Sequence, residues 1–444
     1  MKIQFFILIS FFSFSSFGRA FISDSSEIEI GRLNRNISSQ MMLVKLKNQS
    51  QIDLKNYGEF ETFFKAHDGV WGYLKLNMIP DEESAELLLK DFSKNKNILH
   101  AYFAPLPRNA TESDPEPTDP VLVETPNFEE RQFYLEDAPK GVGARSAWPI
   151  PGGAGKNVKV IDVETCFQDD HEDFMAPFFN GNNPACSEND HGTAVWGEIA
   201  AKKDDKGVTG IAHQAQFGIY GFIEGDLEEV DDQYIKSINE AIQASIQNLE
   251  QGDVLVIEQQ MVGPDLKKYT AVEYWPHIFD QLKMATDKGI ICVEAAGNGG
   301  SNFDDLSYDG AFDLSKRDSG CIIVGAVAPS SLDRLGFSNY GNRLDAAAYG
   351  RMVTTAGYGD LFNAAVNRKY TARFSGTSSA TPIVAGAVAV VSSIAKEKGI
   401  TISPRNMRDA LRLTGTPQSE STRSTRVGNL PSIQALLDIL QLTL

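Results

Sequence analysis

The chain has 444 residues, of which 42% are apolar and 10% aromatic, with 37 glycines and 19 prolines. These proportions exclude collagen-like, low-complexity and wholly disordered chains, and the length leaves room for a large hydrophobic core. Lysine and arginine number 41 against 59 acidic residues, so the formal net charge is -18. An acidic chain lacks the basic face that phosphate groups require, which argues against nucleic acids and anionic membranes as partners.

The first twenty residues have the pattern of a secretory signal. Met1-Lys2 precedes an apolar stretch over residues 3–14, and small residues follow as far as Ala20. This order is typical of a signal peptide, and we expect cleavage after Ala20. An uncleaved membrane anchor is the less favoured alternative, because a span needs roughly 20 apolar residues. The pattern therefore predicts a signal peptide at 1–20 and a secreted or periplasmic protein that does not act at a membrane.

The cysteines are consistent with export. There are four, Cys166, Cys186, Cys292 and Cys321. An even number in an exported chain permits disulfides, and pairing by closeness in the sequence gives Cys166–Cys186 and Cys292–Cys321. Buried free thiols are the alternative. No Cys-x-x-Cys motif occurs and the chain has six histidines, so the sequence does not indicate a zinc site.

Residues 21–110 are predicted to form a small α+β unit with a core over about 40–105. The pattern indicates strands at 41–46, 71–78 and 98–103, an amphipathic helix at 54–66, and a second helix that begins at Pro80. A core of about 65 residues is marginal alone, so we expect it to dock on a larger domain. A linker at 111–127 follows, because residues 112–126 contain five acids, four prolines and no basic residue.

From residue 128 to 444 short apolar strands alternate with helices. Strands are predicted at 158–161, 217–220, 254–257, 290–293 and 321–327, and helices at 232–249 and 277–288. This alternation predicts an α/β fold with a doubly wound, mostly parallel sheet flanked by helices. In such sheets the functional groups gather beyond the carboxyl ends of the strands.

Three residues at such positions could act together. Asp162 closes the strand at 158–161, His191 begins His191-Gly192-Thr193, and Ser378 opens an apolar helix that continues to Ile394. A serine hydroxyl becomes a strong nucleophile when a neighbouring base takes its proton, and histidine suits that task. A buried carboxylate would then orient the imidazole. Backbone N–H groups at a helix start stabilise a negative oxygen beside the serine.

Four segments together resemble the subtilisin-like serine peptidases, or subtilases: Ile161-Asp162, His191-Gly192-Thr193, Ala295-Ala296-Gly297-Asn298 and residues 376–382. The resemblance covers about 128–444, and the order Asp, His, Ser is that of subtilisin. It implies a secreted serine endopeptidase that cleaves peptide bonds through an acyl-enzyme.

On this resemblance Ser378 is the nucleophile, His191 the general base and acid, Asp162 the orienting carboxylate, and Asn298 the side chain of the oxyanion hole. The resemblance also implies a substrate-binding surface made of Gln260, Met261, Val262, Gly263, Ala295, Ala296 and Gly297.

The family resemblance carries further expectations. The chemistry needs no cofactor, and structural calcium is possible, with its ligands unassigned. The unit at 21–110 resembles an inhibitory prodomain, which predicts a monomeric zymogen whose partners are its own prodomain and protein or peptide substrates.

Several positions depart from the family pattern. Val163-Glu164 follow Asp162 where the family has Ser or Thr and then Gly, so we expect a different course for that loop. Trp196 is expected to reshape the mouth of the site. Val262 stands where the family has Gly, which predicts a narrowed subsite that prefers small or linear side chains before the scissile bond.

Glu258 and Glu294 come from strands that we expect to be neighbours. Two close carboxylates would raise the pKa of one of them. They could support the specificity pocket or bind calcium, and the alternative is that each is solvated or hydrogen-bonded.

Two other functions can be set against the peptidase. A catalytically impaired subtilase relative could bind peptides through the same cleft, which the altered residues at 258–264 suggest. An esterase of the α/β-hydrolase type would need Gly-x-Ser-x-Gly and the order Ser, acid, His, and neither is present.

Overall fold

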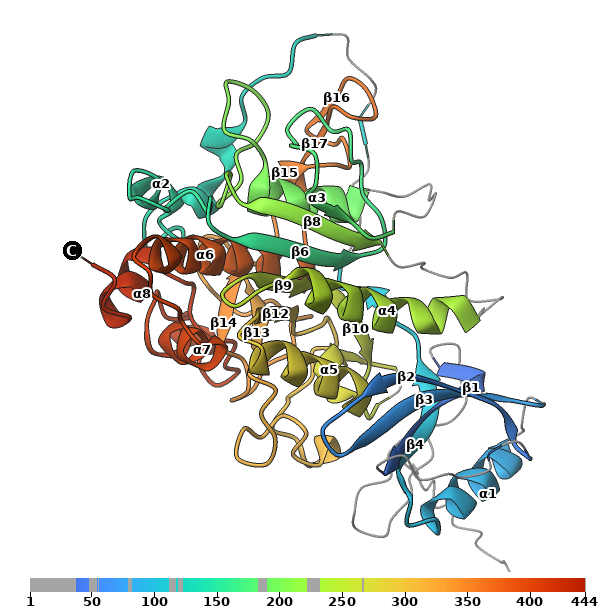
Figure 1. Cartoon of the computed structure of the whole chain (residues 1–444). Coiled ribbons are helices and arrows are strands. Elements are labelled where there is room, and N and C mark those ends of the chain that lie inside the picture. The colour runs from blue at the N-terminus through green and yellow to red at the C-terminus, as the bar shows by residue number, and fades with distance from the viewer. Residues whose placement is uncertain are drawn as a thin grey trace, which may run out of the picture.

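The computed structural model describes residues 37–443 except for 48–53, 55, 79–81, 112–116, 119–122, 183–189, 222–231 and 266. The predicted signal peptide at 1–20 lies outside the described residues. Figure 1 shows a small sheet near the N-terminus beside a larger α/β body.

The small sheet has four antiparallel strands in the order β2-β3-β1-β4. Its elements are β1 (Ile37–Lys47), β2 (Gly58–Lys65), β3 (Gly69–Leu76), α1 (Glu82–Ser93) and β4 (Ile98–Pro105). The predicted strands and the helix after Pro80 are confirmed, and the core of this unit is built around buried side chains such as Met42, Trp71 and Phe103.

The predicted helix at 54–66 is wrong, because these residues include the edge strand β2. The apolar residues Phe60, Phe63 and Phe64 have a spacing of three and four, which imitates one face of a helix. In the structure the pairing of β2 with β3 shifts register between Thr62 and Phe64. This bulge breaks the two-residue alternation of a regular strand, and the misleading spacing follows from it.

The large sheet has seven strands in the order β14-β13-β12-β9-β6-β8-β7, and all of its neighbouring strands are parallel. This confirms the predicted fold class. The strands are β6 (Lys159–Glu164), β7 (Phe179–Asn180), β8 (Gln216–Gly221), β9 (Val254–Ile257), β12 (Ile291–Ala295), β13 (Ile322–Val327) and β14 (Ala346–Tyr349).

Helices cover the large sheet. The longer ones are α3 (Asp190–Ala200), α4 (Asp232–Asn248), α5 (Pro276–Asp287) and α6 (Thr377–Glu397). Helices α4 and α5 contact each other and the sheet, while α3 contacts α6 (Figure 1). After β6 the chain adds β7 and β8 on one side of this strand and then adds β9 on its other side. The order of the strands therefore reverses between β6 and β9. In parallel sheets a site is expected at the carboxyl ends of the strands where this reversal occurs.

The remaining elements surround this core. They are α2 (Ala144–Ala147), α7 (Pro404–Leu413), α8 (Ile433–Ile439), β5 (Arg108–Asn109), β10 (Gln259–Val262), β11 (Tyr269–Ala271), β15 (Val353–Ala356), β16 (Phe362–Asn363), β17 (Lys369–Phe374) and short 3-10 helices at Glu129–Arg131, Phe133–Leu135, Val272–Tyr274, Leu306–Tyr308 and Glu420–Thr422. Two further sheets of three strands have the orders β11-β10-β5 and β15-β17-β16.

Helix α6 is apolar on nearly every side because it is buried. Among the described residues it has the length and composition of a membrane span, but its apolar window lies wholly inside the protein. Pro382 lies inside the helix as its sixth residue, so its missing N–H leaves the carbonyl of Ser378 without the usual hydrogen bond of the helix ladder. The hydropathy of α6 is therefore that of a core helix.

Trp196 does not reshape the mouth of a site as predicted. Its indole is buried on α3 and stacks on Phe174 and Phe217, with ring centroids 4.4 and 4.7 Å apart. The side chain therefore fills the core between α3 and the sheet.

The cysteines correct one predicted disulfide. Cys292 and Cys321 are buried free thiols, although their strands are neighbours. Cys166 is disulfide-bonded. Its predicted partner Cys186 lies outside the described residues.

The N-terminal unit docks against the outer face of α5. The Lys45 ammonium lies 2.8 Å from the Asp280 carboxylate, which also accepts a hydrogen bond of 2.8 Å from the Trp71 indole. The Tyr102 hydroxyl lies 2.7 Å from Nδ1 of His277. This surface combines a paired charge, buried polar contacts and aromatic packing, and Figure 1 shows the small sheet beside α4 and α5.

Candidate active site

The carboxylate that contacts His191 belongs to Glu164. His191 Nδ1 lies 2.5 Å from Oε2 of Glu164, and both side chains are buried. The other oxygen, Oε1, accepts hydrogen bonds from the backbone N–H of Thr165 at 2.6 Å and from its hydroxyl at 3.1 Å. Both oxygens of Glu164 are therefore held, and Oε2 is fixed toward the imidazole.

The prediction that Asp162 orients His191 is wrong. Strand β6 does not end at Ile161 but continues to Glu164, so Asp162 lies within the strand. Asp162 and Glu164 are two residues apart and face the same side of the sheet, and Glu164 is one pleat nearer the carboxyl end, where α3 begins. Among the described residues, neither carboxylate oxygen of Asp162 has a hydrogen-bond partner. The apolar Val163 after Asp162 was the sequence signal that the buried strand continues.

Gly192 allows α3 to approach β6 closely. A Cβ at this position would lie 2.4 Å from Cγ of Glu164 and 2.5 Å from the carbonyl oxygen of Cys166. Any larger residue would push the start of α3 away from the strand. The glycine in His191-Gly192-Thr193 therefore sets the contact between the imidazole and the carboxylate.

Ser378 lies in the first turn of α6. Gly376 precedes the helix with a φ of 95°, a conformation that favours glycine. The turn places Ser378 in the buried interior, with its hydroxyl 3.4 Å from the carbonyl oxygen of Glu258. The aromatic ring of Phe374, just before this turn, meets the His191 ring edge-on at 5.5 Å. The loop before α6 thus contacts the imidazole through Phe374 and carries Ser378 four residues further along the chain.

Two N–H donors converge near Ser378. The side-chain oxygen of Asn298 accepts hydrogen bonds from the backbone N–H of Thr377 at 3.1 Å and from its hydroxyl at 2.9 Å. This orientation turns Nδ2 of Asn298 toward the carbonyl oxygen of Ala110, at 2.6 Å. The backbone N–H of Ser378 donates to the same oxygen at 3.3 Å. One donor from a side chain and one from a helix start therefore hold a single carbonyl oxygen.

The chain's own residues 108–110 lie in this cleft as a short antiparallel strand. β5 pairs with β10, with Arg108 opposite Gln260 and Asn109 opposite Gln259. The N–H of Ala110 donates to the carbonyl of Glu258 at 3.1 Å. The segment is thus bound through its main chain, as an extended peptide is when it adds to the edge of a sheet.

The predicted substrate-binding residues take different places around this strand. Gln260 contacts the segment directly, through a hydrogen bond of 2.9 Å from its Nε2 to the carbonyl of Asn109. Met261 and Val262 are fully buried and pair with β11. Residues 295–297 form the end of β12 and the turn before Asn298, and the backbone N–H of Gly297 donates to Oγ1 of Thr377 at 3.2 Å.

Three more carboxyl groups are buried behind the site. Burial raises the pKa of Asp162, and the nearby Glu164 raises it further. Burial also raises the pKa of Glu258, with contributions from Asp162 and Glu164, and burial alone raises that of Glu198. These directions favour the protonated, neutral forms, which burial tolerates far better than carboxylates.

Glu258 and Glu294 do not form the predicted pair. Glu294 lies opposite Ile257 in the register of β12 with β9. Burial raises the pKa of Glu294, and the charged neighbour that adds most to this is Glu273. Each glutamate therefore belongs to its own cluster.

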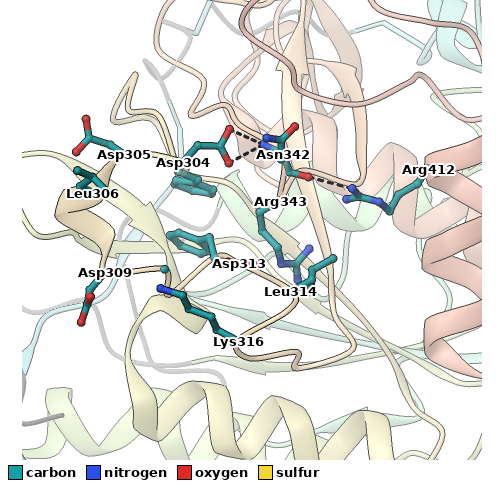
Figure 2. A pocket seen from close by; sticks show the side chains of 13 residues that line it. Asp304, Asp305, Leu306, Asp309, Asp313, Leu314, Lys316, Asn342, Arg343 and Arg412 are labelled. Carbon is teal, nitrogen blue, oxygen red and sulfur yellow. Dashed lines mark hydrogen bonds between the residues drawn. The ribbon is translucent and has the colours of Figure 1, made fainter. Parts of the chain in front are cut away.

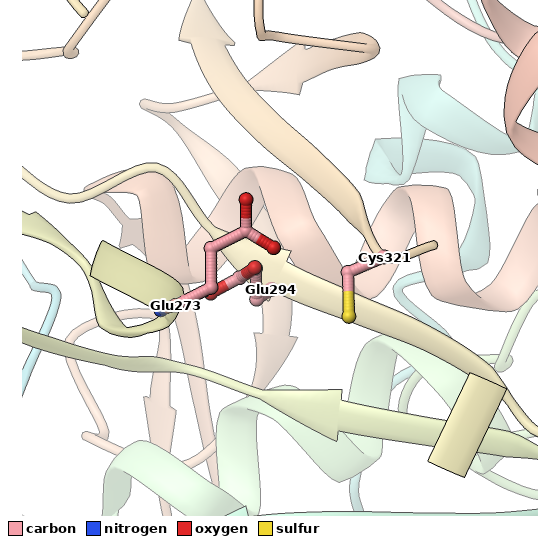
Figure 3. A group of neighbouring side chains, drawn as sticks. All are labelled: Glu273, Glu294 and Cys321. Atoms are coloured by element: carbon pink, nitrogen blue, oxygen red, sulfur yellow. The ribbon is translucent and has the colours of Figure 1, made fainter. Parts of the chain in front are cut away.

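Glu273, Glu294 and Cys321 form the group of described residues whose ligand atoms all lie within 4.8 Å of one another (Figure 3). Arg343 already neutralises this group, since its guanidinium lies 3.1 Å from Glu273. Burial opposes ionisation of Glu273, but Arg343 beside it lowers the pKa of this carboxyl overall. A buried arginine already pairs with Glu273, and a thiol is not a ligand that calcium prefers, so these residues do not fit a calcium site.

A separate cavity of about 520 Å³ is lined by acidic loop residues, including Asp304, Asp305 and Asp313 (Figure 2). Its carboxylates accept hydrogen bonds from backbone N–H groups, either of a neighbouring loop or of their own turn. Both oxygens of Asp304 accept from the backbone N–H of Asn342, at 3.1 and 3.0 Å. Asp305 caps Ser307 and Asp313 caps Ser315. None of the residues around Ser378 lines this cavity, and Asp304, Asp305 and Asp313 are each explained by a backbone group that they bind.

The comparisons with known proteins agree with this geometry. The family model described as the subtilase family, Peptidase S8, matches residues 113–429. The chain belongs to the subtilase family.

Its relatives include an intracellular serine protease of Paenibacillus polymyxa, 30% identical over 283 residues that cover 60% of this chain and 76% of the relative. Subtilisin NAT of Bacillus subtilis subsp. natto is 30% identical over 64% of this chain and 67% of its own.

A solved structure shares the fold over nearly the whole chain. Fervidolysin from Fervidobacterium pennivorans, a keratinolytic enzyme related to subtilisin, matches with a TM-score of 0.65 and 19% identity. The match covers 95% of this chain and 63% of fervidolysin. At this identity the similarity shows the subtilisin-like fold alone. Family membership makes the chain a serine endopeptidase of the subtilisin type, whose chemistry needs no cofactor.

Glu164→Gln, compared with Asp162→Asn, tests which of the two carboxylates orients His191. The amide keeps the size of the side chain but cannot stabilise an imidazolium, so kcat for a peptide substrate should fall about 10³- to 10⁴-fold. Asp162→Asn should reduce kcat less than about tenfold, because Asp162 does not contact His191 and is favoured in its neutral form. A larger loss in Asp162→Asn than in Glu164→Gln, each measured per folded molecule, would contradict the assignment.

Proposed function

We propose that the chain is a secreted serine endopeptidase made as a zymogen, with Ser378, His191 and Glu164 as its catalytic triad. The observation that carries the proposal is the carbonyl of Ala110, which accepts hydrogen bonds from Nδ2 of Asn298 and from the backbone N–H of Ser378. A carbonyl held by two N–H donors at a serine has the surroundings that acyl transfer requires.

The reaction follows from these contacts. The hydroxyl of Ser378 attacks the substrate carbonyl carbon and gives its proton to Nε2 of His191, while Nδ1–H stays bound to Glu164. The developing oxyanion is held by Asn298 Nδ2 and the N–H of Ser378. When the peptide C–N bond breaks, the imidazolium protonates the leaving amine and an acyl-enzyme remains. Water then attacks the ester with His191 again as base, which releases the acid and restores Ser378.

In this proposal the zymogen has three parts after the signal peptide. Residues 21–110 form the prodomain, 111–127 the acidic linker and 128–444 the catalytic domain. The prodomain acts as an intramolecular inhibitor because β5 fills the substrate strand position on β10 and the small sheet is anchored on α5. The bond that follows the bound carbonyl is Ala110–Thr111, so this is the bond that Ser378 would cleave first.

Export is supported by two features. The first twenty residues have the order of a signal peptide, and Cys166 is disulfide-bonded, which is characteristic of oxidising compartments. Relatives include proteases described as intracellular as well as subtilisins. The proposal places this chain with the exported group.

Self-cleavage tests the proposal directly. Expression of the wild-type precursor should give two fragments that separate at Ala110–Thr111, and the new N-terminus should be Thr111. Ser378→Ala should remain a single chain, because the nucleophile is gone. Intact mass and N-terminal sequencing of both proteins measure this. Cleavage of Ser378→Ala at the same bond would show that another protease is responsible, and an uncleaved, inactive but folded wild type would favour the peptide-binding alternative.

The cleft should prefer a small residue before the scissile bond. Ala110 has the smallest chiral side chain, and its burial is complete. Val262→Gly should raise kcat/KM for a phenylalanine substrate relative to an alanine substrate by about tenfold or more, since a few methylene groups in a pocket are worth 1–3 kcal/mol each. A wild-type peptide-library profile dominated by Phe, Tyr or Trp would contradict the narrowed subsite.

Inhibition by the cleaved prodomain should weaken in acid. His277 is buried against Tyr102 and Trp71, and burial lowers its pKa to about 3. Once the prodomain leaves, the imidazole should return toward its ordinary pKa of about 6.5. The bound state therefore excludes a proton that the free state accepts below about pH 6.5, and the affinity should fall as the pH drops from 6.5 toward 4.5, by up to about tenfold per unit.

The matched control is His277→Gln, whose amide can still bond the Tyr102 hydroxyl but does not titrate. The inhibition constant of the cleaved prodomain, measured between pH 7 and 4.5, should change much less for this variant. An equal pH dependence in wild type and His277→Gln would assign the effect to other groups.

A further inference from the structure

We propose that Gln260 is a positioning residue that connects the substrate main chain to the oxyanion hole. Its Nε2 donates to the carbonyl of Asn109, one residue before Ala110, at 2.9 Å. Its Oε1 accepts from the backbone N–H of Asn298 at 2.8 Å. The inference rests on the proposed function, because it treats residues 108–110 as an occupant of the substrate site.

The backbone around Gln260 holds this side chain in place. Gln260 lies in the middle of the three-stranded sheet, opposite Ala271 of β11 on one edge and Arg108 of β5 on the other. The residue is only 4% exposed. A buried amide must have both its donor and its acceptor paired, and here one pairs with the bound segment and the other with the enzyme.

Gln260 and Thr377 hold Asn298 from two sides. Thr377 fixes the side-chain oxygen, and Gln260 fixes the backbone N–H. The position of Asn298 Nδ2, which donates to the bound carbonyl, therefore depends on both contacts. The Gln260 amide is planar, so its hydrogen bond to the substrate carbonyl and its hydrogen bond from Asn298 are linked in orientation. A substrate whose main chain binds Gln260 therefore also helps to position Asn298 Nδ2, the donor that stabilises the transition state.

The contact is specific for a backbone group and not for a side chain. Every peptide has a carbonyl at the position of Asn109, so the interaction tolerates any sequence there. It demands an acyl group on the nitrogen of the residue before the scissile bond. The geometry thus favours cleavage within or at the end of a peptide over hydrolysis of amino acid esters with a free amine.

Substitutions of Gln260 can separate the two halves of the amide. Gln260→Glu, assayed at a pH where its carboxyl is ionised, keeps an oxygen that accepts from Asn298 but loses the donor to the substrate. Gln260→Met has a similar length and loses both. Gln214 is an exposed glutamine outside the site, so Gln214→Glu and Gln214→Met are matched controls that should retain wild-type kinetics.

The test compares a peptide ester with its analogue in which the carbonyl at the position of Asn109 is a thioamide, whose sulfur accepts hydrogen bonds weakly. Wild type should lose about five- to tenfold in kcat/KM on the thioamide, the range for one neutral hydrogen bond. Both Gln260 variants should lose less than about twofold, since the donor is already absent. Gln260→Met should also lower kcat on both substrates below that of Gln260→Glu, because Asn298 loses its backbone acceptor.

Active sites are counted with a serine-reactive phosphonate, so that misfolded enzyme does not enter the rates. A thioamide penalty in the Gln260 variants equal to that in wild type would overturn the contact to substrate. Equal kcat values for Gln260→Met and Gln260→Glu would overturn the link to Asn298. A wild type that hydrolyses neither substrate would contradict the proposed function itself, which is a different result from an active wild type without a thioamide penalty.

Discussion

The contact between Glu164 and His191 is the constraint on which the site depends. It needs β6 to remain a strand up to its last residue and α3 to begin directly beside that end, which Gly192 permits. A glutamate is one methylene longer than an aspartate, and Thr165 takes up one of its oxygens with two hydrogen bonds. The hydrogen bonds from Thr165 hold the longer side chain of Glu164 in place. Oε2 of Glu164 therefore has a fixed position toward the imidazole.

Burial favours the neutral forms of the acids behind this contact, Asp162, Glu258 and Glu198, and a buried neutral acid is far less costly than a buried carboxylate. Neutral neighbours add no charge beside the pair of Glu164 and His191, so in the proposed mechanism they would not compete for the imidazolium. Both the stability of the core and the proposed catalysis therefore require these acids to be neutral. This requirement explains how several acids can lie close to one imidazole.

The sequence predicts the large sheet well because its strands are short, apolar and buried on both faces, so their pattern does not depend on exact pairing. The helix predicted at 54–66 failed because a bulge in β2 changes the alternation locally, and a bulge depends on the partner strand. The sequence places the orienting acid at Asp162, two residues before Glu164, for a related reason. A charged residue after an apolar run predicts the end of a strand, whereas β6 continues to Glu164. Ser378, His191 and Asn298 could be found because each follows a glycine-marked turn or begins a helix.

In the proposed zymogen, the same contacts would make residues 108–110 both the first substrate and an inhibitor. Cleavage after Ala110 would leave a carboxylate where the carbonyl had been, still facing Asn298 and Ser378, with the β5 hydrogen bonds to β10 unbroken. Departure of this product then depends on a surface away from the cleft, where Lys45, Trp71 and Tyr102 hold Asp280 and His277. Chemistry therefore decides which bond breaks, and the interface with α5 decides when the site opens.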